Sequence, residues 1–339
     1  MAIFSSNVLS PLLPPDAEPI VIGLVNNMPD AALRTTERQF DELLTAASSN
    51  FVVQLRLFSV PEVPRSEAGR AHIDQHYEDI GRLWESRLDG LIVTGTEPRT
   101  PDLADEPYWS DLTKLIDWAE DHTISTVWSC LAAHAAVFHI DGIGRRPLRK
   151  KLSGVFDCER IIDHAIVDAA PTRWRLPHSR YNELPEVALA SKGYQILSRS
   201  PDVGADVFVK KSNSLFIFFQ GHPEYDAGAL LREYRRDVGR FLAGERDTYP
   251  EIPRGYFDEE STDAFAAFQQ RAMHNREIDL LSSFPAEEAK QKLRHLWREP
   301  AARIYANWFS YLVEQKSRRQ ARNEGRESAR MHPYPNGTP

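Results

Sequence analysis

Apolar runs alternate with amphipathic segments along the first 140 residues of the chain. The segments between the runs carry apolar residues at helical spacing, as Leu33, Phe40 and Leu44 do after the run at residues 19–26. A further helix is expected over residues 76–87. Alternating strands and helices predict a parallel sheet with helices on both faces. Four apolar runs of strand length read as buried strands: residues 19–26, 51–60, 88–95 and 125–129.

The pattern changes after residue 150. From residue 151 onward the strand-like runs become shorter and more polar, with turns between them, which predicts antiparallel additions to the sheet. Residues 214–226 return to a strongly apolar strand, broken by Gly221 and Pro223. An amphipathic helix follows, and a second helical region covers residues 262–314.

These patterns predict one folded domain with two polar ends. We expect a flexible leader over residues 1–18 and a single α/β domain over residues 19–314, whose last part, 262–314, is a helical addition. Residues 315–339 are polar throughout and are expected to form a disordered tail.

The acidic balance of the chain limits the classes of partner. Acidic residues outnumber basic ones by 49 to 41, and the formal net charge is −8. A nucleic-acid binder needs a basic face, so we expect small-molecule substrates and no nucleic acid. No run of about 18 apolar residues occurs, and the first 18 residues contain three prolines and no cationic n-region. We therefore expect no membrane span, no signal peptide and a cytoplasmic location.

Cys130 lies where the apolar run 125–129 meets the start of an apolar helix. A thiol at a helix N-terminus meets the helix dipole and free backbone N–H groups, which favour the thiolate and offer an oxyanion site. The alternative is that Cys130 is a small core residue, because cysteine is among the most buried residue types. Position alone leaves both interpretations open.

His222 and Glu224 strengthen the catalytic interpretation. Both lie in the Gly-His-Pro-Glu loop that follows the last apolar strand. A cysteine nucleophile needs a base, and the base needs an orienting carboxylate. In extended backbone, residues two apart leave the same face, so Cys130, His222 and Glu224 could form a triad for acyl transfer. A capping histidine in a turn is the alternative.

Other candidate residues have weaker support for a functional role. His134 follows Cys130 by four residues and could face the same site, although a hydrogen-bonded core histidine is the plainer interpretation. Glu233 and Arg236 are three apart on one helix face, where a surface ion pair is the default. The second cysteine, Cys158, reads as core or surface; two thiols alone form neither a disulfide framework nor a zinc site, so we expect no metal.

Six stretches in chain order resemble one enzyme family. The similarity covers about residues 19–314, and the resemblance is to the homoserine O-succinyltransferase family, whose members have a class I glutamine-amidotransferase-like fold. The stretches are GLIVTG, STVWSC, GIGRRPLRKKLSGVF, PHSRYNELP, QGHPEYDAGALLREYRRDV and ANWFSYLV.

The resemblance implies a ping-pong acyl transfer from acyl-CoA to the hydroxyl of homoserine. Cys130 matches the cysteine that carries the acyl group as a thioester, His222 the base, and Glu224 the carboxylate behind it. Arg236 matches the arginine that holds the carboxylate of the amino-acid acceptor, a role suited to its bidentate fork, and Glu233 matches its neighbour.

The chain departs from the family pattern near the chemistry. Leu131 and His134 replace a tryptophan and a glutamine, a lysine near the first strand has no counterpart, and residues about 262–300 look like an insertion. Arg99 occupies the position where glycine accompanies succinyl donors and glutamate accompanies acetyl donors. An arginine can pair with the terminal carboxylate of a succinyl chain, so we expect succinyl-CoA as donor. Arg180, in the PHSRY stretch, is also expected to bind substrate.

From the residues and the resemblance together we expect a homoserine O-succinyltransferase of methionine biosynthesis, with acyl-CoA as co-substrate, no bound cofactor and a homodimeric state. A homoserine or serine O-acetyltransferase is the first alternative. A glutamine amidotransferase-like hydrolase is the second, although Trp128-Ser129 and Leu131-Ala132 supply none of the glycines that flank the cysteine in such enzymes. A catalytically dead binding protein would have no need of all three residues of the Cys/His/Glu set.

Overall fold

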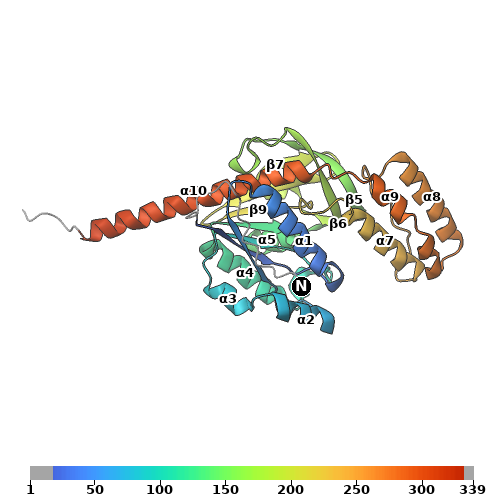
Figure 1. Cartoon of the computed structure of the whole chain (residues 1–339), viewed down its shortest axis with the longest axis horizontal. Helices are drawn as coiled ribbons and strands as arrows, with labels where there is room; N and C mark the ends of the chain where they lie inside the picture. The colour runs from blue at the N-terminus through green and yellow to red at the C-terminus, as the bar shows by residue number, and fades with distance from the viewer. Residues whose placement is uncertain (1–17, 332–339) are drawn as a thin grey trace, which may run out of the picture.

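A mixed β-sheet organises the chain, and the computed structural model describes residues 18–331 (Figure 1). Within that range nine strands form the one sheet, in the order β2-β1-β3-β4-β9-β8-β7-β5-β6. Their bounds are β1 Ile20–Val25, β2 Val53–Phe58, β3 Gly90–Val93, β4 Ser125–Ser129, β5 Arg146–Arg160, β6 Arg173–Glu183, β7 Gln195–Ser200, β8 Gly204–Lys211 and β9 Leu215–Phe219.

Helices connect and cover these strands. Three short 3₁₀ helices lie between the described elements, at Leu103–Asp105, Ala165–Val167 and Ile278–Ser283. The α-helices are α1 Asp30–Ala47, α2 Glu67–His76, α3 Ile80–Glu85, α4 Trp109–His122, α5 Leu131–Asp141, α6 Glu186–Ser191, α7 Ala229–Leu242, α8 Glu259–His274, α9 Ala286–Lys292 and α10 Arg298–Met331.

The sheet has a parallel half and an antiparallel half. Strands β2, β1, β3, β4 and β9 run parallel, whereas β8, β7, β5 and β6 continue the sheet by antiparallel pairing. The carboxyl ends of β4 and β9 are neighbours, because Ser129 pairs with Phe219. This register brings Cys130 and the loop that begins at Gln220 to the same edge of the sheet, where sites of open α/β sheets lie.

Two apolar cores hold the helices against the sheet. One packs α1, α7 and α10 on one face, with Phe40 and Trp308 among its fully buried side chains. The other packs α4 and α5 on the opposite face around Trp128. Both faces of the parallel strands are therefore covered, which explains why these strands are apolar without alternation.

The helical region after α7 packs back on that helix. Phe265 of α8 and Phe284 both make ring contacts with Tyr234, at centroid distances of 5.4 and 5.7 Å. Trp297, just before α10, is buried and donates its indole N–H to the carbonyl of Tyr225 at 2.7 Å. This region therefore contacts the loop that carries His222.

The expected parallel sheet with flanking helices, antiparallel additions and a C-terminal helical region is confirmed. The strands after residue 145 are not shorter, however, since β5 spans 15 residues. The helix expected over 76–87 is found as α3 but is shorter, because Asp79 caps its start by accepting a hydrogen bond from the backbone N–H of Gly81. The separate helix α2, which the pattern had not indicated, is capped by Ser66 and ends at His76.

The disordered tail expected from residue 315 is not found over residues 315–331, where α10 continues and extends beyond the body of the molecule (Figure 1). Its extension is anchored where it leaves the body. Lys316 Nζ lies 3.1 Å from an Asp89 carboxylate oxygen, and Arg319 donates to the carbonyl of Thr123 at 3.2 Å. Residues 332–339, and all but the last residue of the expected leader 1–18, lie outside the described residues. No helix in the described range is long and apolar enough to cross a bilayer.

Candidate active site

Cys130 occupies a sharp turn between β4 and α5. Its backbone has φ 53° and ψ −113°, a conformation that costs a residue with a side chain about 1–3 kcal/mol. The turn is held because Cys130 N–H donates to the carbonyl of Phe219 at 2.8 Å. The side chain is half-buried at the start of an eleven-residue helix, whose first N–H groups have no intrahelical partner.

Gly95 allows the loop after β3 to approach this turn. A Cβ at Gly95 would lie 2.5 Å from the Leu131 Cβ and 3.0 Å from the Leu131 backbone nitrogen. Only a glycine fits that spacing, so the backbone after β3 packs directly against the first residue of α5.

His222 and Glu224 form a buried pair on the neighbouring loop. The Nδ1 atom of His222 lies 2.8 Å from Glu224 Oε1, and both side chains are nearly inaccessible. A carboxylate partner assigns the proton to Nδ1 and leaves the Nε2 lone pair for another group. Burial lowers the pKa of His222, but the neighbouring charges of Cys130 and Glu224 outweigh it and raise the pKa well above the ordinary value.

The backbone of this loop is fixed independently of its side chains. His222 N–H donates to the carbonyl of Pro177 on β6 at 2.8 Å. The ring of His222 stacks on that of Tyr225 with a centroid distance of 4.1 Å and an interplanar angle of 16°. The structure therefore brings together Cys130, His222 and Glu224, the three residues that the sequence singled out for catalysis.

Tyr225 links the histidine to Glu233 on α7. Its hydroxyl donates to Glu233 Oε1 at 2.5 Å, and Ser179 of β6 donates to Oε2. Lys151 of β5 lies 3.2 Å from Oε2. Burial raises the pKa of Glu233, but the charge of Lys151 and the two hydroxyl donors outweigh it and lower the pKa to about 2. The lowered pKa keeps Glu233 an ionised carboxylate at neutral pH.

Lys151 bridges two acidic residues, and Arg236 lies beside them. The Lys151 ammonium contacts Asp237 at 2.8 Å as well as Glu233, and its side chain is only 14% exposed. Arg236 directs its guanidinium to Asp237, at 3.0 and 3.1 Å, and remains 44% exposed. The Glu233–Arg236 ion pair that helix spacing allowed is thus replaced by a Glu233–Lys151 pair.

The sequence had not singled out Lys151, Ser179 or Tyr225. Each lies inside a stretch that was quoted for another reason: Lys151 in the basic run, Ser179 in PHSRY and Tyr225 in GHPEYD. Only the fold reveals that their polar atoms converge on one carboxylate.

Arg180 and His134 are buried near the nucleophile. The Arg180 guanidinium donates to the carbonyls of Asn182 and Val203, at 2.7 and 2.5 Å, and its side chain makes no ion pair among the described residues. Burial lowers its pKa, and the charge of Cys130 is the largest opposing influence. His134 contacts Gln220 at 3.2 Å, and burial lowers its pKa to about 3, which confirms it as a neutral core histidine.

A second buried cluster lies behind the His222 loop. Cys158, His178 and Asp206 are fully buried, with candidate ligand atoms within 4.8 Å of one another, and His178 Nε2 lies 3.2 Å from Asp206. Burial and the charge of Asp206 raise the pKa of the Cys158 thiol. Ser198 donates to the Asp206 carboxylate at 3.0 Å, and Arg180 adds a positive charge beside the cluster.

Arg99 lies away from this network. Its side chain is exposed on the wall of a cavity of about 1100 Å³ at the carboxyl ends of β1 and β2, and its backbone N–H donates to Glu106 at 2.5 Å. Cys130, His222 and Glu224 do not line that cavity.

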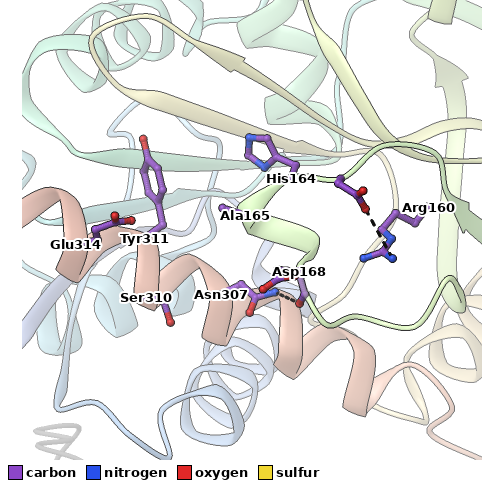
Figure 2. Close-up of a pocket in the computed structure, with 9 residues that line it drawn as sticks. Arg160, His164, Ala165, Asp168, Asn307, Ser310, Tyr311 and Glu314 are labelled. Carbon is purple, nitrogen blue, oxygen red and sulfur yellow. Dashed lines mark hydrogen bonds and ion pairs between the residues drawn. The ribbon is translucent and has the colours of Figure 1, made fainter.

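Another hollow, of about 520 Å³, separates residues 160–168 from α10 (Figure 2). Asn307 crosses it and donates to the carbonyl of Asp168 at 2.6 Å. Since no residue of the catalytic cluster lines this hollow, we do not place the chemistry there.

Comparison with known proteins gives one consistent family. The homoserine O-succinyltransferase family profile matches residues 14–319. A protein of Rhodopseudomonas palustris named homoserine O-succinyltransferase is 49% identical, over 88% of this chain and 90% of that one. Proteins of the same name from Methylorubrum extorquens and Thiothrix nivea are 46% and 37% identical, over 86% and 91% of this chain and 87% of each relative.

Solved structures resemble the chain more distantly. A glutamine amidotransferase of Methylobacillus flagellatus aligns with a TM-score of 0.48 and 14% identity, over 87% of this chain and 95% of that one. A glutamine amidotransferase of Thermotoga maritima aligns with a TM-score of 0.44 and 12% identity, over 85% and 97%.

Proposed function

The chain belongs to the homoserine O-succinyltransferase family, and from that premise we propose that it transfers the succinyl group of succinyl-CoA to the hydroxyl of homoserine through a thioester on Cys130. One observation carries the catalytic assignment. A strained cysteine at a strand-to-helix turn stands beside a buried histidine whose far nitrogen is held by a carboxylate. That arrangement supplies a nucleophile, a base and an orienting group.

In the first half-reaction, the Cys130 thiol gives its proton to His222 Nε2, and the sulfur attacks the thioester carbonyl of the donor. The bond from that carbon to the CoA sulfur breaks, and CoA leaves with the proton from Nε2. The raised pKa of His222 makes its imidazole a better acceptor for the thiol proton. Free N–H groups at the start of α5, beginning with Leu131, are placed to receive the developing oxyanion.

In the second half-reaction, the homoserine hydroxyl gives its proton to His222 Nε2 and its oxygen attacks the acyl carbon. The bond from that carbon to Cys130 breaks, which releases the ester and returns the thiolate. Glu224 holds the ring and stabilises the imidazolium in both steps.

The carboxylate and ammonium groups of homoserine need charged partners. Arg236 is the candidate for the carboxylate, because its guanidinium is partly exposed and, among the described residues, is bound only to Asp237. Glu233, ionised and 18% exposed, is the candidate for the ammonium. We assign Arg99 to the donor side, where its free guanidinium can pair with the succinyl carboxylate. The reaction needs a reduced thiol, which fits a cytoplasmic enzyme.

Intact mass spectrometry tests this proposal. Incubation with succinyl-CoA and no acceptor should add one succinyl group to the wild type and none to Cys130→Ala, and homoserine should then discharge it. Cys158 serves as the internal control, because its buried, protonated thiol should stay unmodified. Succinylation of Cys130→Ala, or a wild type that stays unacylated by succinyl-CoA, would refute the mechanism.

A further inference from the structure

A basic segment stands out in an acidic protein. Five of the seven residues from 145 to 151 are arginine or lysine, while the whole chain carries a formal charge of −8. Concentrated positive charge in a net-negative protein indicates an anionic partner at that place. Of these five cations, Lys151 is the one that pairs with Glu233, the carboxylate linked through Tyr225 to His222.

The structure places this segment on a bulge at the edge of the sheet. The start of β5 pairs with the end of β6 as far as Pro147 and Asn182, and pairing resumes only at Leu152 and Arg180. Residues 148–151 therefore oppose the single residue Tyr181. Bulges redirect side chains, and here β6 is the edge strand of the sheet (Figure 1).

The bulge has an inner and an outer end. Lys151 turns inward to Glu233 and Asp237. Arg149, two residues earlier, is exposed and makes no hydrogen bond or ion pair with any residue that the structure describes. Tyr181 is 52% exposed, and its ring centroid lies 6.0 Å from Lys151 Nζ. An unpaired guanidinium (Arg149) and a half-exposed aromatic ring (Tyr181) thus lie beside Lys151 and its carboxylate partners.

The larger cavity, at the carboxyl ends of β1 and β2, is less suited to a polyanion. The 1100 Å³ cavity that includes Arg99 is lined by three arginines but by five carboxylates. One of the arginines, Arg65, is buried and already donates to the carbonyls of Asn26 and Met28. A nucleotide with several phosphates would meet net negative charge there. At the bulge, Lys150 and Lys151 are paired with carboxylates, and Arg149 is left without a carboxylate partner among the described residues.

We propose that Arg149 and Tyr181 bind the nucleotide half of CoA, Arg149 by pairing with a phosphate and Tyr181 by stacking on the adenine. This inference rests on the proposed function, in that the donor thioester is presented to Cys130. Arginine suits phosphate through its bidentate fork, and aromatic rings stack on any base. Lys150 adds positive charge beside them, since its pair with Glu251 is exposed on both sides and weak.

Two donors separate this assignment from a general loss of activity. Succinyl-CoA carries the nucleotide, and succinyl-pantetheine carries the same thioester without it. Losing one charged hydrogen bond of about 1.5 kcal/mol corresponds to roughly tenfold. Arg149→Gln should therefore raise the KM for succinyl-CoA about tenfold, leave kcat unchanged, and leave kcat/KM for succinyl-pantetheine unchanged. Tyr181→Ala should likewise raise the KM for succinyl-CoA and leave kcat/KM for succinyl-pantetheine unchanged.

Arg87→Gln is the matched control. Arg87 is also exposed and makes no hydrogen bond or ion pair with the described residues, but it lies just before the amino end of β3, in the parallel half of the sheet. Its substitution should therefore leave the KM for both donors unchanged. Calorimetric titration with CoA alone, without turnover, should give the same tenfold weakening for Arg149→Gln.

The outcomes are distinguishable. Equal losses with both donors, or unchanged CoA binding in Arg149→Gln and Tyr181→Ala, overturn the nucleotide site. If the wild type binds CoA through Arg149 but does not acylate homoserine, the proposed function fails while the site stands. If the wild type neither binds CoA nor turns over either donor, both are wrong.

Discussion

Replacing Lys151 by methionine tests the charge network that joins α7 to the catalytic loop. Methionine keeps most of the side-chain volume and removes only the ammonium. Glu233 and Asp237 then lose a cation that lies 3.2 and 2.8 Å away, while both remain largely withdrawn from water. A buried carboxylate that loses its partner is strongly destabilising, by about 3–5 kcal/mol in comparable cases.

The magnitude follows from the pKa of Glu233. The value is lowered from 4.5 to about 2 even though burial alone would raise it, and Lys151 is the largest influence that lowers it. A shift of about 2.5 in pKa at roughly 1.4 kcal/mol per unit gives about 3 kcal/mol as the net stabilisation of this carboxylate after the cost of burial. Because Lys151 is the largest of the favourable influences and its removal leaves a buried carboxylate without its cation, we expect a loss of about 3 kcal/mol at pH 7.

Urea unfolding at pH 7 and at lower pH measures this loss. Because the native pKa of Glu233 is depressed, its contribution is fully present above pH 4.5 and is lost as the pH falls toward 2. Lys151→Met raises that native pKa, so the difference between wild type and variant should be largest at pH 7 and should narrow as the pH falls below 4.5. Lys150→Met is the control, because Lys150 is 69% exposed and pairs with an exposed glutamate, and it should cost less than 1 kcal/mol.

Two results would contradict this reasoning. If Lys151→Met costs no more than Lys150→Met, the ammonium does not stabilise the buried carboxylates. If the loss is about 3 kcal/mol but does not change between pH 7 and pH 3, it arises from packing and not from the ionised state of Glu233.

Four further outcomes are expected. His222→Ala should lower kcat by orders of magnitude and Glu224→Gln by less, because the histidine moves the proton and the carboxylate only orients it; equal small losses in both would point to another base. Arg236→Lys should raise the KM for homoserine and leave thioester formation nearly intact, as a two-stage mass assay would show. Arg99→Gly should lower the succinyl-CoA to acetyl-CoA ratio of kcat/KM by about tenfold, and an unmoved ratio would remove Arg99 from donor selection. The free energy of unfolding of Cys130→Gly, measured in urea, should exceed that of Cys130→Ala by about 1 kcal/mol, because glycine adopts φ 53° without strain. If Cys130→Ala is the more stable of the two, the backbone at this turn is not strained.

The sequence indicates the parallel half of the fold well because its signals are local. Strands β1, β3, β4 and β9 are short apolar runs buried on both faces, so their pattern survives whatever surrounds them. The antiparallel half was harder to read. Strand β5 mixes exposed and buried positions and is interrupted by its bulge, so no single period runs through its 15 residues.

The catalytic residues were readable because each lies at the carboxyl end of an apolar strand. Cys130 follows β4 and His222 follows β9, and the pairing of these two strands brings both to one edge. The backbone strain at Cys130 could not be foreseen, because no glycine flanks the turn. Here the turn is held by the hydrogen bond from Cys130 to Phe219 on the paired strand, and that bond is a product of the fold.

The network around Glu233 shows why spacing along a helix is not enough. Arg236 is correctly placed one turn away, yet the two do not form an ion pair in the described structure. Glu233 is only 18% exposed and Lys151 only 14%, whereas Arg236 stays 44% exposed. A carboxylate withdrawn from water gains most from a cation that is equally withdrawn, because the attraction between them is least screened there. Lys151 comes from a strand 82 residues earlier, so the choice between the local and the distant cation is made by burial, which a sequence pattern does not encode.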